Sequence, residues 1–507
     1  MNPVSVPVAD INALINYYCR NGYFRHVQTV CNEVLKKRSN DPMMLFWKAV
    51  GMMREGQANE AIRELDNLLG RADGQMRLPI KIAALAAHRS CKVVDNEAIG
   101  QLESDLMSGE AENAPDRARL TAATLHWHLG ETFEAKEHVL ALLRLQPSSV
   151  PALTLAGWLE IAAAEAEIAG IKFGAVDGYS GASNGDPTEE FEAAAAYFDK
   201  ATAANGGKRD LESSMGMAKL AHLREQHKES LDHLSQVIGT HTWFLPALVE
   251  KSLVLLAMGD WEQAVETAQR ALNQADSEGG RGKPAAGTID ALRVCALYSL
   301  SQESDAREAQ NKISELSQAL DRHEPMNAPL FYKVSRPFAR LAGRNPSILS
   351  LTLALAEKAC KLAPGKAEYA AEYAYQLMLL EDYHNAMGTL KKATAMEEGS
   401  ESVMPYLIRC QIMTGDLNEA EMQISFVIDM MNGVDPEMAL NEALVAWRKH
   451  GDAEQAISHL DRALETHMAT VKTLQHDVDY FVKLNPDFLL EIGREVATAI
   501  AWARTLD

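Results

Sequence analysis

The stretches Gly259-Asp-Trp-Glu-Gln-Ala264-Val and Gly451-Asp-Ala-Glu-Gln-Ala456-Ile show the repeating unit of this chain. In each stretch a glycine ends one run of helix-forming residues, because glycine readily adopts the left-handed conformation that closes a helix. The alanine five residues later opens the packed face of the next helix. Each stretch therefore predicts a helix-turn-helix junction.

Taking that alanine, or the residue that replaces it, as an anchor gives eleven positions. They are Val27, Ala61, Ala135, Ala194, Ser230, Ala264, Ala309, Thr352, Ala386, Ala420 and Ala456. A spacing of 34 residues recurs among them, which is the tetratricopeptide period. The spacing of 74 residues between Ala61 and Ala135 contains one degenerate unit near Leu78 to Met107. The spacings of 59 residues (Ala135 to Ala194), 45 residues (Ala264 to Ala309) and 43 residues (Ala309 to Thr352) each correspond to one unit plus an insertion. We predict an all-α tetratricopeptide-repeat (TPR) superhelical solenoid of about a dozen helix-turn-helix pairs.

Positions outside the anchor agree with this repeat. Four residues after it, seven of the clearest units carry an apolar residue: Leu65, Val139, Leu234, Ala268, Leu390, Ile424 and Leu460. Residues four apart share one face of a helix, so this face is expected to pack on the partner helix.

Two stretches interrupt the period and divide the chain. We expect an N-terminal TPR array over residues 1–275 with a Gly-rich inserted loop at 170–187, a flexible loop at 276–287, and a continuing array over 288–507. A chain of 507 residues is too long for one ordinary globular core, which agrees with a repeat array.

Composition restricts the classes of partner. The formal net charge is −21, so nucleic acid and anionic membranes are repelled, and partners with basic or apolar surfaces are favoured. The six cysteines form no C-x-x-C pair and are interpreted as reduced core residues of a cytosolic protein. The first twenty residues do not resemble a secretory signal, and no segment reads as transmembrane, because Glu160, Glu165, Glu167 and Lys172 interrupt the most apolar window.

No group of residues supports catalysis, a cofactor or a metal ion. Ser183 lies in a G-x-S-x-G pattern but lacks the preceding strand that a nucleophile elbow requires. His126 and His128 are two residues apart and point to different sides of a helix, so they cannot share one ion and are expected to be solvated or capping. The chain is therefore predicted not to be an enzyme.

The first helix of each pair is expected to line the concave groove of such a solenoid. The groove residues predicted from their spacing to the anchor are Phe46, Val50, Met53, Leu120, Trp127, Met215, Val249, Leu253, Leu256, Tyr375, Met378, Arg409, Ile412 and Arg448. This set is mostly apolar, whereas a groove that grips a carboxylate needs repeated Lys, Arg and Asn donors.

Two interpretations of these residues remain open from the sequence. They bind a long helical or extended apolar segment of a partner, or they touch one another in a tightly coiled solenoid. In the first case Leu253→Glu abolishes partner capture and leaves helicity intact; in the second it lowers helicity.

Four longer strings are more specific in sequence than the repeat consensus requires. They are Ile15 to Val27 (INYYCRNGYFRHV), Phe244 to Leu272 around FLPALVEK and DWEQAVETAQRAL, His323 to Tyr332 (HEPMNAPLFY) and Leu484 to Ile492 (LNPDFLLEI). Through them the chain resembles the N-terminal part of the tetratricopeptide-repeat protein 21 family, also called intraflagellar transport protein 139. Family members are longer and continue with further repeats, and the two insertions depart from the family pattern.

The resemblance implies a non-catalytic subunit of intraflagellar transport complex A. That role comprises retrograde ciliary or flagellar transport, cilium assembly and import of ciliary membrane proteins. Its partners would be the other subunits of complex A, together with complex B, motors or cargo adaptors, with no nucleic acid and no membrane insertion. The implied locations are the cytoplasm and the cilium or flagellum, at the axoneme and basal body, in association with the cytoskeleton.

Two alternatives stay open from the residues alone. One is a generic TPR scaffold or cochaperone of a soluble multiprotein complex. The other is an enzyme whose catalytic domain follows residue 507, with this array as its substrate-binding arm.

Overall fold

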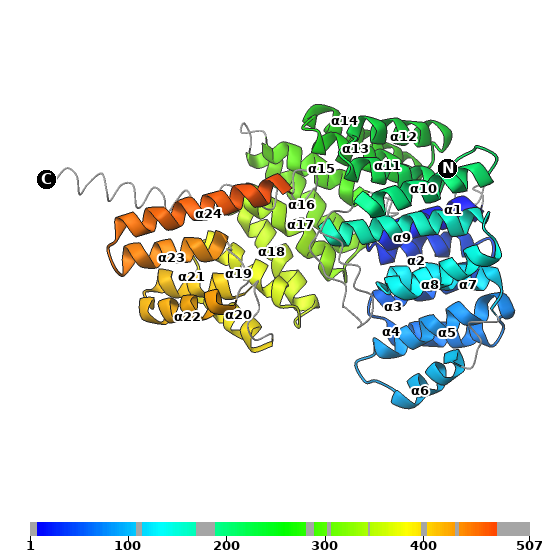
Figure 1. Ribbon diagram of the computed structural model, residues 1–507, viewed down its shortest axis with the longest axis horizontal. Helices are drawn as coiled ribbons and strands as arrows, with labels where there is room; N and C mark the ends of the chain where they lie inside the picture. The colour runs from blue at the N-terminus through cyan, green and yellow to red at the C-terminus, as the bar shows by residue number, and fades with distance from the viewer. Residues whose placement is uncertain are drawn as a thin grey trace. The chain divides into compact units, whose positions relative to one another are not determined.

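The structure is a computed structural model that describes residues 8–107, 114–168, 188–279, 288–301, 306–342, 345–396, 403–430 and 436–473. These residues form twenty-four helices and no strand (Figure 1). The helices group into consecutive antiparallel pairs, so the predicted all-α solenoid of about a dozen pairs is confirmed.

The bounds of the first fourteen helices are α1 Val8–Arg20, α2 Phe24–Leu35, α3 Pro42–Arg54, α4 Ala58–Leu69, α5 Gly74–Arg89, α6 Asn96–Asp105, α7 Asp116–Leu129, α8 Thr132–Leu145, α9 Val150–Ile168, α10 Thr188–Ala204, α11 Leu211–Leu223, α12 His227–Thr240, α13 Leu245–Ala257 and α14 Trp261–Gly279. The remaining ten are α15 Thr288–Ser301, α16 Ala306–His323, α17 Ala328–Leu341, α18 Pro346–Leu362, α19 Ala367–Leu379, α20 Tyr383–Met396, α21 Met404–Thr414, α22 Leu417–Met430, α23 Pro436–Arg448 and α24 Ala453–Thr473.

The predicted anchors have one structural role. All eleven lie on the second helix of a pair, and none is more than 1% exposed. The degenerate unit is the pair α5 and α6. Helix α6 has no buried residue, and α5 packs directly on α7, which explains why no anchor was recognisable there.

The chain divides into two compact units. Unit 1 comprises residues 1–291 together with Arg322–Glu324, and unit 2 comprises residues 292–321 and 325–507. The predicted loop at 170–187 lies outside the described residues. Helix α14 continues to Gly279, so the first four residues of the predicted loop at 276–287 are helical and the rest lie outside the described part.

Glycines allow close helix packing at one point of unit 1. The ring of Phe198 on α10 is fully buried and lies against Gly157 of α9 and Gly216 of α11. A Cβ atom at Gly157 would lie 2.7 Å from carbon atoms of that ring. Any larger residue at these two glycines would collide with Phe198, because protein interiors are close-packed.

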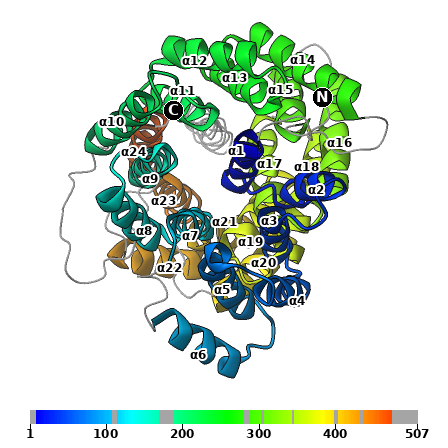
Figure 2. The ribbon, with the colours of Figure 1, turned by 90° about the vertical axis from the view of Figure 1, so that its right-hand side faces the viewer.

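The first helix of unit 1 lies inside the turn made by the later helices of the same unit (Figure 2). Seven residues of α1 are buried, and they are Ile11, Ala13, Leu14, Ile15, Tyr17, Tyr18 and Cys19. A helix buried nearly all round is a core helix and not a surface helix. Helix α1 is therefore part of the core of unit 1.

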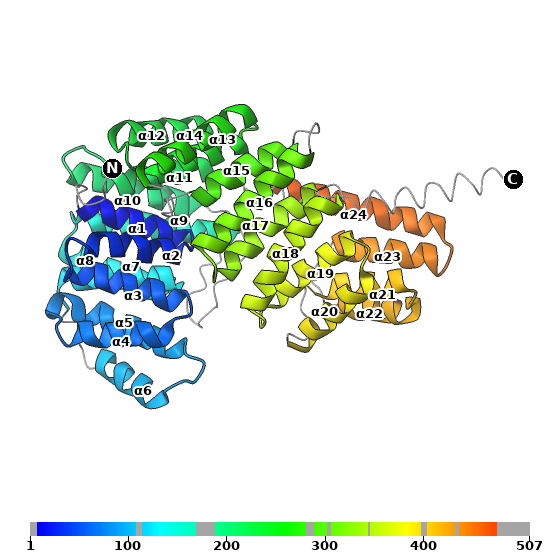
Figure 3. The ribbon, with the colours of Figure 1, turned by 180° about the vertical axis from the view of Figure 1, so that it is seen from behind.

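Successive pairs of unit 2 follow one another from α17 to α24 (Figure 3). The first helices of neighbouring pairs are joined by buried polar contacts. Arg340 of α17 bonds to Glu372 of α19, and Arg409 of α21 donates to Asn441 of α23 at 2.5 Å. Each contact joins residues 32 positions apart, about one repeat.

The six cysteines are free, and four of them (Cys19, Cys31, Cys295 and Cys410) are buried. Burial raises the pKa of the Cys19 and Cys410 thiols to about 12. Within the described part of the chain, no helix is long and apolar enough to cross a bilayer.

Candidate partner-binding face

The predicted groove residues lie on first helices, and most are covered by their own chain. Ten are buried: Phe46, Val50, Met53, Met215, Val249, Leu256, Tyr375, Met378, Arg409 and Ile412. The other four, Leu120, Trp127, Leu253 and Arg448, are half-buried. The nine residues of unit 1 lie on α3, α7, α11 and α13, and the five of unit 2 lie on α19, α21 and α23.

In unit 1 the end of α1 lies on the inner face, which is the side of α7, α9, α11 and α13 that carries Trp127, Trp158, Glu212 and Glu250. The guanidinium of Arg20 lies 3.8 Å from the centroid of the Trp158 ring and 5.8 Å from that of Trp127. It also forms an ion pair with Glu212 of α11. The Trp158 indole donates to the backbone oxygen of Glu212 at 3.2 Å, which holds ring and carboxylate together. One arginine thus contacts α7, α9 and α11 at once.

Tyr17 extends this contact to α13. Its hydroxyl donates to the carboxylate of Glu250 at 3.2 Å, and its ring meets Phe244 edge-on at 6.3 Å. Burial raises the pKa of the Glu250 carboxyl, although Lys219 acts in the opposite direction. Burial likewise raises the pKa of Glu212 despite its pairing with Arg20. Both carboxylates are enclosed between α1 and the inner face.

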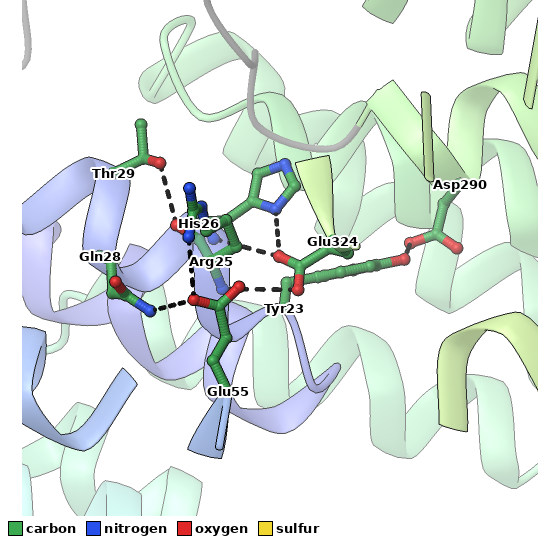
Figure 4. A network of polar contacts seen from close by, with 8 residues as sticks. All are labelled: Tyr23, Arg25, His26, Gln28, Thr29, Glu55, Asp290 and Glu324. Atoms are coloured by element: carbon green, nitrogen blue, oxygen red, sulfur yellow. Dashed lines mark hydrogen bonds and ion pairs between the residues drawn. The ribbon is translucent and has the colours of Figure 1, made fainter. Parts of the chain in front are cut away.

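A second network ties the N-terminal hairpin, α1 and α2, to residues about 300 positions later (Figure 4). The Glu324 carboxylate accepts from the backbone N–H groups of Arg25 at 3.4 Å and His26 at 3.1 Å, and lies 2.7 Å from the Nδ1 atom of His26. The Tyr23 hydroxyl donates to Asp290 at 2.5 Å. All of these residues belong to unit 1.

Glu55, the C-cap residue of α3, also joins this network. It accepts from the Gln28 amide at 2.6 Å and from the Arg25 guanidinium at 3.2 Å. The side chain of Thr29 donates back to the carbonyl oxygen of Arg25. The start of α2 is therefore held both by its neighbour α3 and by the distant Glu324.

Residues from three of the four strings that exceed the repeat pattern meet in unit 1. Tyr17 from the first string contacts Phe244 and Glu250 from the second, and His26 from the first contacts Glu324 from the third. The fourth string, at 484–492, lies outside the described residues. The sequence marked these strings as unusual, but it did not identify α1 as the helix that fills the inner face.

In unit 2 the two predicted groove arginines bond within the unit. Arg409 forms an ion pair with Glu437 at 2.9 Å, and Arg448 contacts the Met413 sulfur at 3.2 Å. The ring of Tyr375 lies 3.8 Å from the guanidinium of Arg340. The inner positions of unit 2 thus contact neighbouring repeats of the same chain.

The described surface has hollows in both units. A cavity of about 130 Å³ in unit 1 lies beside Tyr17, Arg20 and Glu250 and is the part of the inner face that α1 leaves open. A hollow of about 620 Å³ in unit 2 is lined by α20, α21 and α22, and Lys391 and Glu419 are among its lining residues.

The two histidines considered for metal binding have different surroundings. His126 Nδ1 lies 2.6 Å from Glu131, and its ring stacks on His138. His128 is buried against Trp127 and lies beside Trp47 of α3, so the expectation that it is solvated or capping is wrong. Among the described residues no group of three potential ligands could hold a metal ion.

Comparison with solved structures returns helical-repeat proteins at low similarity. The Cut9 and Hcn1 hetero-tetramer of the APC/C matches with a TM-score of 0.36 and 15% identity, over 98% of this chain and 89% of that chain. Yeast Tom70 matches with a TM-score of 0.35 and 12% identity, over 91% and 92%.

Comparison of sequences is more specific. Human tetratricopeptide repeat protein 21B is 32% identical over 96% of this chain and 34% of its own length, and the mouse protein gives the same values. Human tetratricopeptide repeat protein 21A is 27% identical over 96% of this chain. The chain spans about a third of the length of these curated relatives.

Two family profiles cover most of the chain. "Tetratricopeptide repeat protein 21 N-terminal ARM repeat" matches residues 15–265, and "Tetratricopeptide repeat protein 21 second ARM domain" matches residues 311–501. The first match includes the α1 residues that fill the inner face of unit 1. From the two profiles and the similarity to its relatives, the chain belongs to the tetratricopeptide repeat protein 21 family.

Proposed function

We propose that this protein is a non-catalytic scaffold subunit of intraflagellar transport complex A. Its role would be retrograde ciliary or flagellar transport, cilium assembly and import of ciliary membrane proteins. The observation that carries the proposal is membership of the tetratricopeptide repeat protein 21 family along 96% of the chain. The partners would be the other complex A subunits, with complex B, motors or cargo adaptors, in the cytoplasm and at the axoneme and basal body.

The inner faces support a scaffold more than a cochaperone. A TPR groove that captures a free carboxylate needs several cationic donors directed at the ligand. Lys219 pairs with Glu165 at 2.8 Å, and Arg409 pairs with Glu437. These cations are already engaged by carboxylates of the same chain, which disfavours carboxylate capture.

Affinity purification from a ciliated cell tests the proposal. The tagged chain is expected to recover complex A subunits in fixed ratio and to localise to basal bodies and cilia. Recovery of chaperones without ciliary transport subunits would overturn it. A matched sample from non-ciliating cells separates assembly of the complex from its localisation.

Leu253→Glu separates the two interpretations of the groove in the same experiment. Leu253 lies on α13, one turn after the Glu250 that Tyr17 contacts. Because α1 covers this face, we expect a charge there to disturb unit 1 and accelerate labelling of Cys19. Loss of partner capture with unchanged Cys19 labelling would show that the inner face binds the partner directly.

A further inference from the structure

Helix α2 begins without a cap of its own. Tyr23 occupies the N-cap position and makes no side-chain capping bond. The first four N–H groups of a helix have no partner within the helix, and the helix dipole favours a negative charge there. Glu324, which is 1% exposed, supplies that charge from 298 residues away by accepting from the N–H groups of Arg25 and His26.

This distant cap matters because long-range contacts hold much of the N-terminal hairpin in place. In a repeat array each unit depends on its immediate neighbours, so one unit can open while the rest stays folded. Within the described part of the chain, α2 packs on the following helix, α3. The other attachments of the hairpin include Glu324, the bond from Tyr23 to Asp290, and the contacts of α1 with the inner face.

The inner face beneath α1 has the chemistry of an arginine site. Trp158 presents its ring and Glu212 its carboxylate to one guanidinium, and cation–π and charge-assisted contacts both favour arginine. Glu250, one repeat further along the face, accepts a hydroxyl. Helix α1 satisfies both groups with Tyr17 and Arg20, three residues apart and therefore on the same side of the helix.

We propose that the N-terminal hairpin is a built-in occupant of the inner face of unit 1, latched by Glu324, and that this face recognises a helix carrying an arginine three residues after an aromatic residue. A partner helix of this kind binds when the hairpin is released. Burial of seven α1 residues makes release rare in the wild-type chain. Loss of the Glu324 latch raises the frequency of release.

Thiol labelling of the full chain tests the latch. Cys19 and Cys31 lie buried in the hairpin, and Cys410 lies buried in unit 2 as an internal reference. In Glu324→Ala we expect N-ethylmaleimide to modify Cys19 and Cys31 roughly tenfold faster, because a charged helix cap is lost. Cys410 keeps its wild-type rate. Unchanged rates at Cys19 and Cys31, or an equal rise at Cys410, would overturn the latch.

Two further variants support this test. Glu324→Gln keeps an acceptor oxygen and loses the charge, so it is expected to give rates between wild type and Glu324→Ala. Glu262→Ala removes an exposed carboxylate from the first turn of α14 and is expected to match wild type at all three cysteines. An effect of Glu262→Ala as large as that of Glu324→Ala would assign the change to net charge and overturn the latch.

Peptide binding tests the recognition chemistry. The probe is a fluorescent peptide of residues 8–20 with Cys19→Ser, and the receptor is the full chain carrying Arg20→Ala and Glu324→Ala. We expect this receptor to bind the probe at least tenfold more tightly than the wild-type chain does. A probe with Arg20→Glu should not bind. Equal binding of the two probes, or no binding to a receptor whose Cys19 labels fast, would overturn the proposal.

Discussion

Units 1 and 2 use the same two-helix repeat but complete their inner faces differently. In unit 1 the contacts of α1 that cover the inner face join residues 192 and 233 positions apart, Arg20 with Glu212 and Tyr17 with Glu250. In unit 2 the corresponding contacts join residues 28 to 36 positions apart, within neighbouring repeats. One unit is closed by its own first helix, and the other is built from nearest-neighbour contacts.

This difference predicts different responses to damage. A nearest-neighbour array loses stability locally, whereas a unit closed by distant contacts couples its first helix to its last. The free cysteines report on the units separately, because Cys19 and Cys31 lie in unit 1 and Cys360 and Cys410 in unit 2.

The largest effect is expected for Glu372→Ala in unit 2. Glu372 is buried and accepts from Arg340 and, at 2.7 Å, from Gln376. Its removal leaves a buried guanidinium without its carboxylate, which costs about 3–5 kcal/mol. Labelling of Cys360 and Cys410 in moderate urea should accelerate strongly, while Cys19 is unchanged.

Glu368→Ala is the control for this prediction, because Glu368 lies one turn earlier on α19 and is exposed. It should leave the unfolding midpoint within error of wild type. Acceleration of Cys19 labelling in Glu372→Ala to the same extent as Cys410 would contradict local unfolding of unit 2.

Gly216→Ala tests the packing of unit 1. The added methyl group collides with the buried Phe198 ring, and overpacking of this kind costs about 1–3 kcal/mol. Adding Phe198→Leu should restore part of the loss, which a double-mutant cycle in urea measures. A Cβ atom at Gly239 on α12 would have no atom within 4 Å, so Gly239→Ala should stabilise unit 1 slightly through the higher helix propensity of alanine. Equal losses at both glycines would contradict the role of Phe198.

His128 predicts a pH dependence specific to unit 1. Burial, followed by Arg20 and Arg54, lowers the pKa of His128 to about 3. The unfolded chain therefore binds a proton near pH 6.5 that the folded chain does not, and stability falls as pH decreases. From pH 7 to pH 5 this loss is about 2 kcal/mol.

His128→Gln should remove that part of the pH dependence. The measurement is the urea midpoint for loss of Cys19 protection at pH 7 and at pH 5, compared with that of Cys410 at each pH. An identical decline in wild type and variant would show that other groups cause it.

The smallest effect is expected for Glu250→Gln. Burial raises the pKa of this carboxyl. Its favourable contribution to the free energy of unfolding is therefore complete below about pH 4.5 and is lost as the pH rises through the folded-state pKa. The amide keeps an acceptor for Tyr17 and cannot ionise. At pH 7 we expect the free energy of unfolding of the variant to exceed that of the wild type by less than about 1 kcal/mol. A loss at pH 7 would show that the charged form is stabilised by Lys219.

Much of the fold was predictable because the repeat is local. A small residue recurs wherever two helices of a pair cross, so Ala61, Ala135 and Ala386 could be recognised from spacing, and all are fully buried. The unit with α6 escaped this pattern because α6 buries none of its residues. The end of α14 was less predictable, since helix ends depend on weak local signals.

The inner face was only partly predictable. Spacing placed Met215, Val249 and Arg409 on first helices, but it could not say what covers them. The residues that cover the face in unit 1, Tyr17 and Arg20, lie about 190 to 230 positions from their partners. The only signal in the sequence was that their string, INYYCRNGYFRHV, exceeds the repeat pattern.

The two-helix repeat, its period and the buried crossing points could be predicted from the amino-acid sequence, because these depend on residues within about 34 positions of one another. The filling of the inner face of unit 1 by α1 and the capping of α2 by Glu324 depend on long-range contacts that are visible only in the folded chain. The small rotation between successive repeats accumulates over many units. Its sum, and not any single repeat, brings the first helix against α11 and α13.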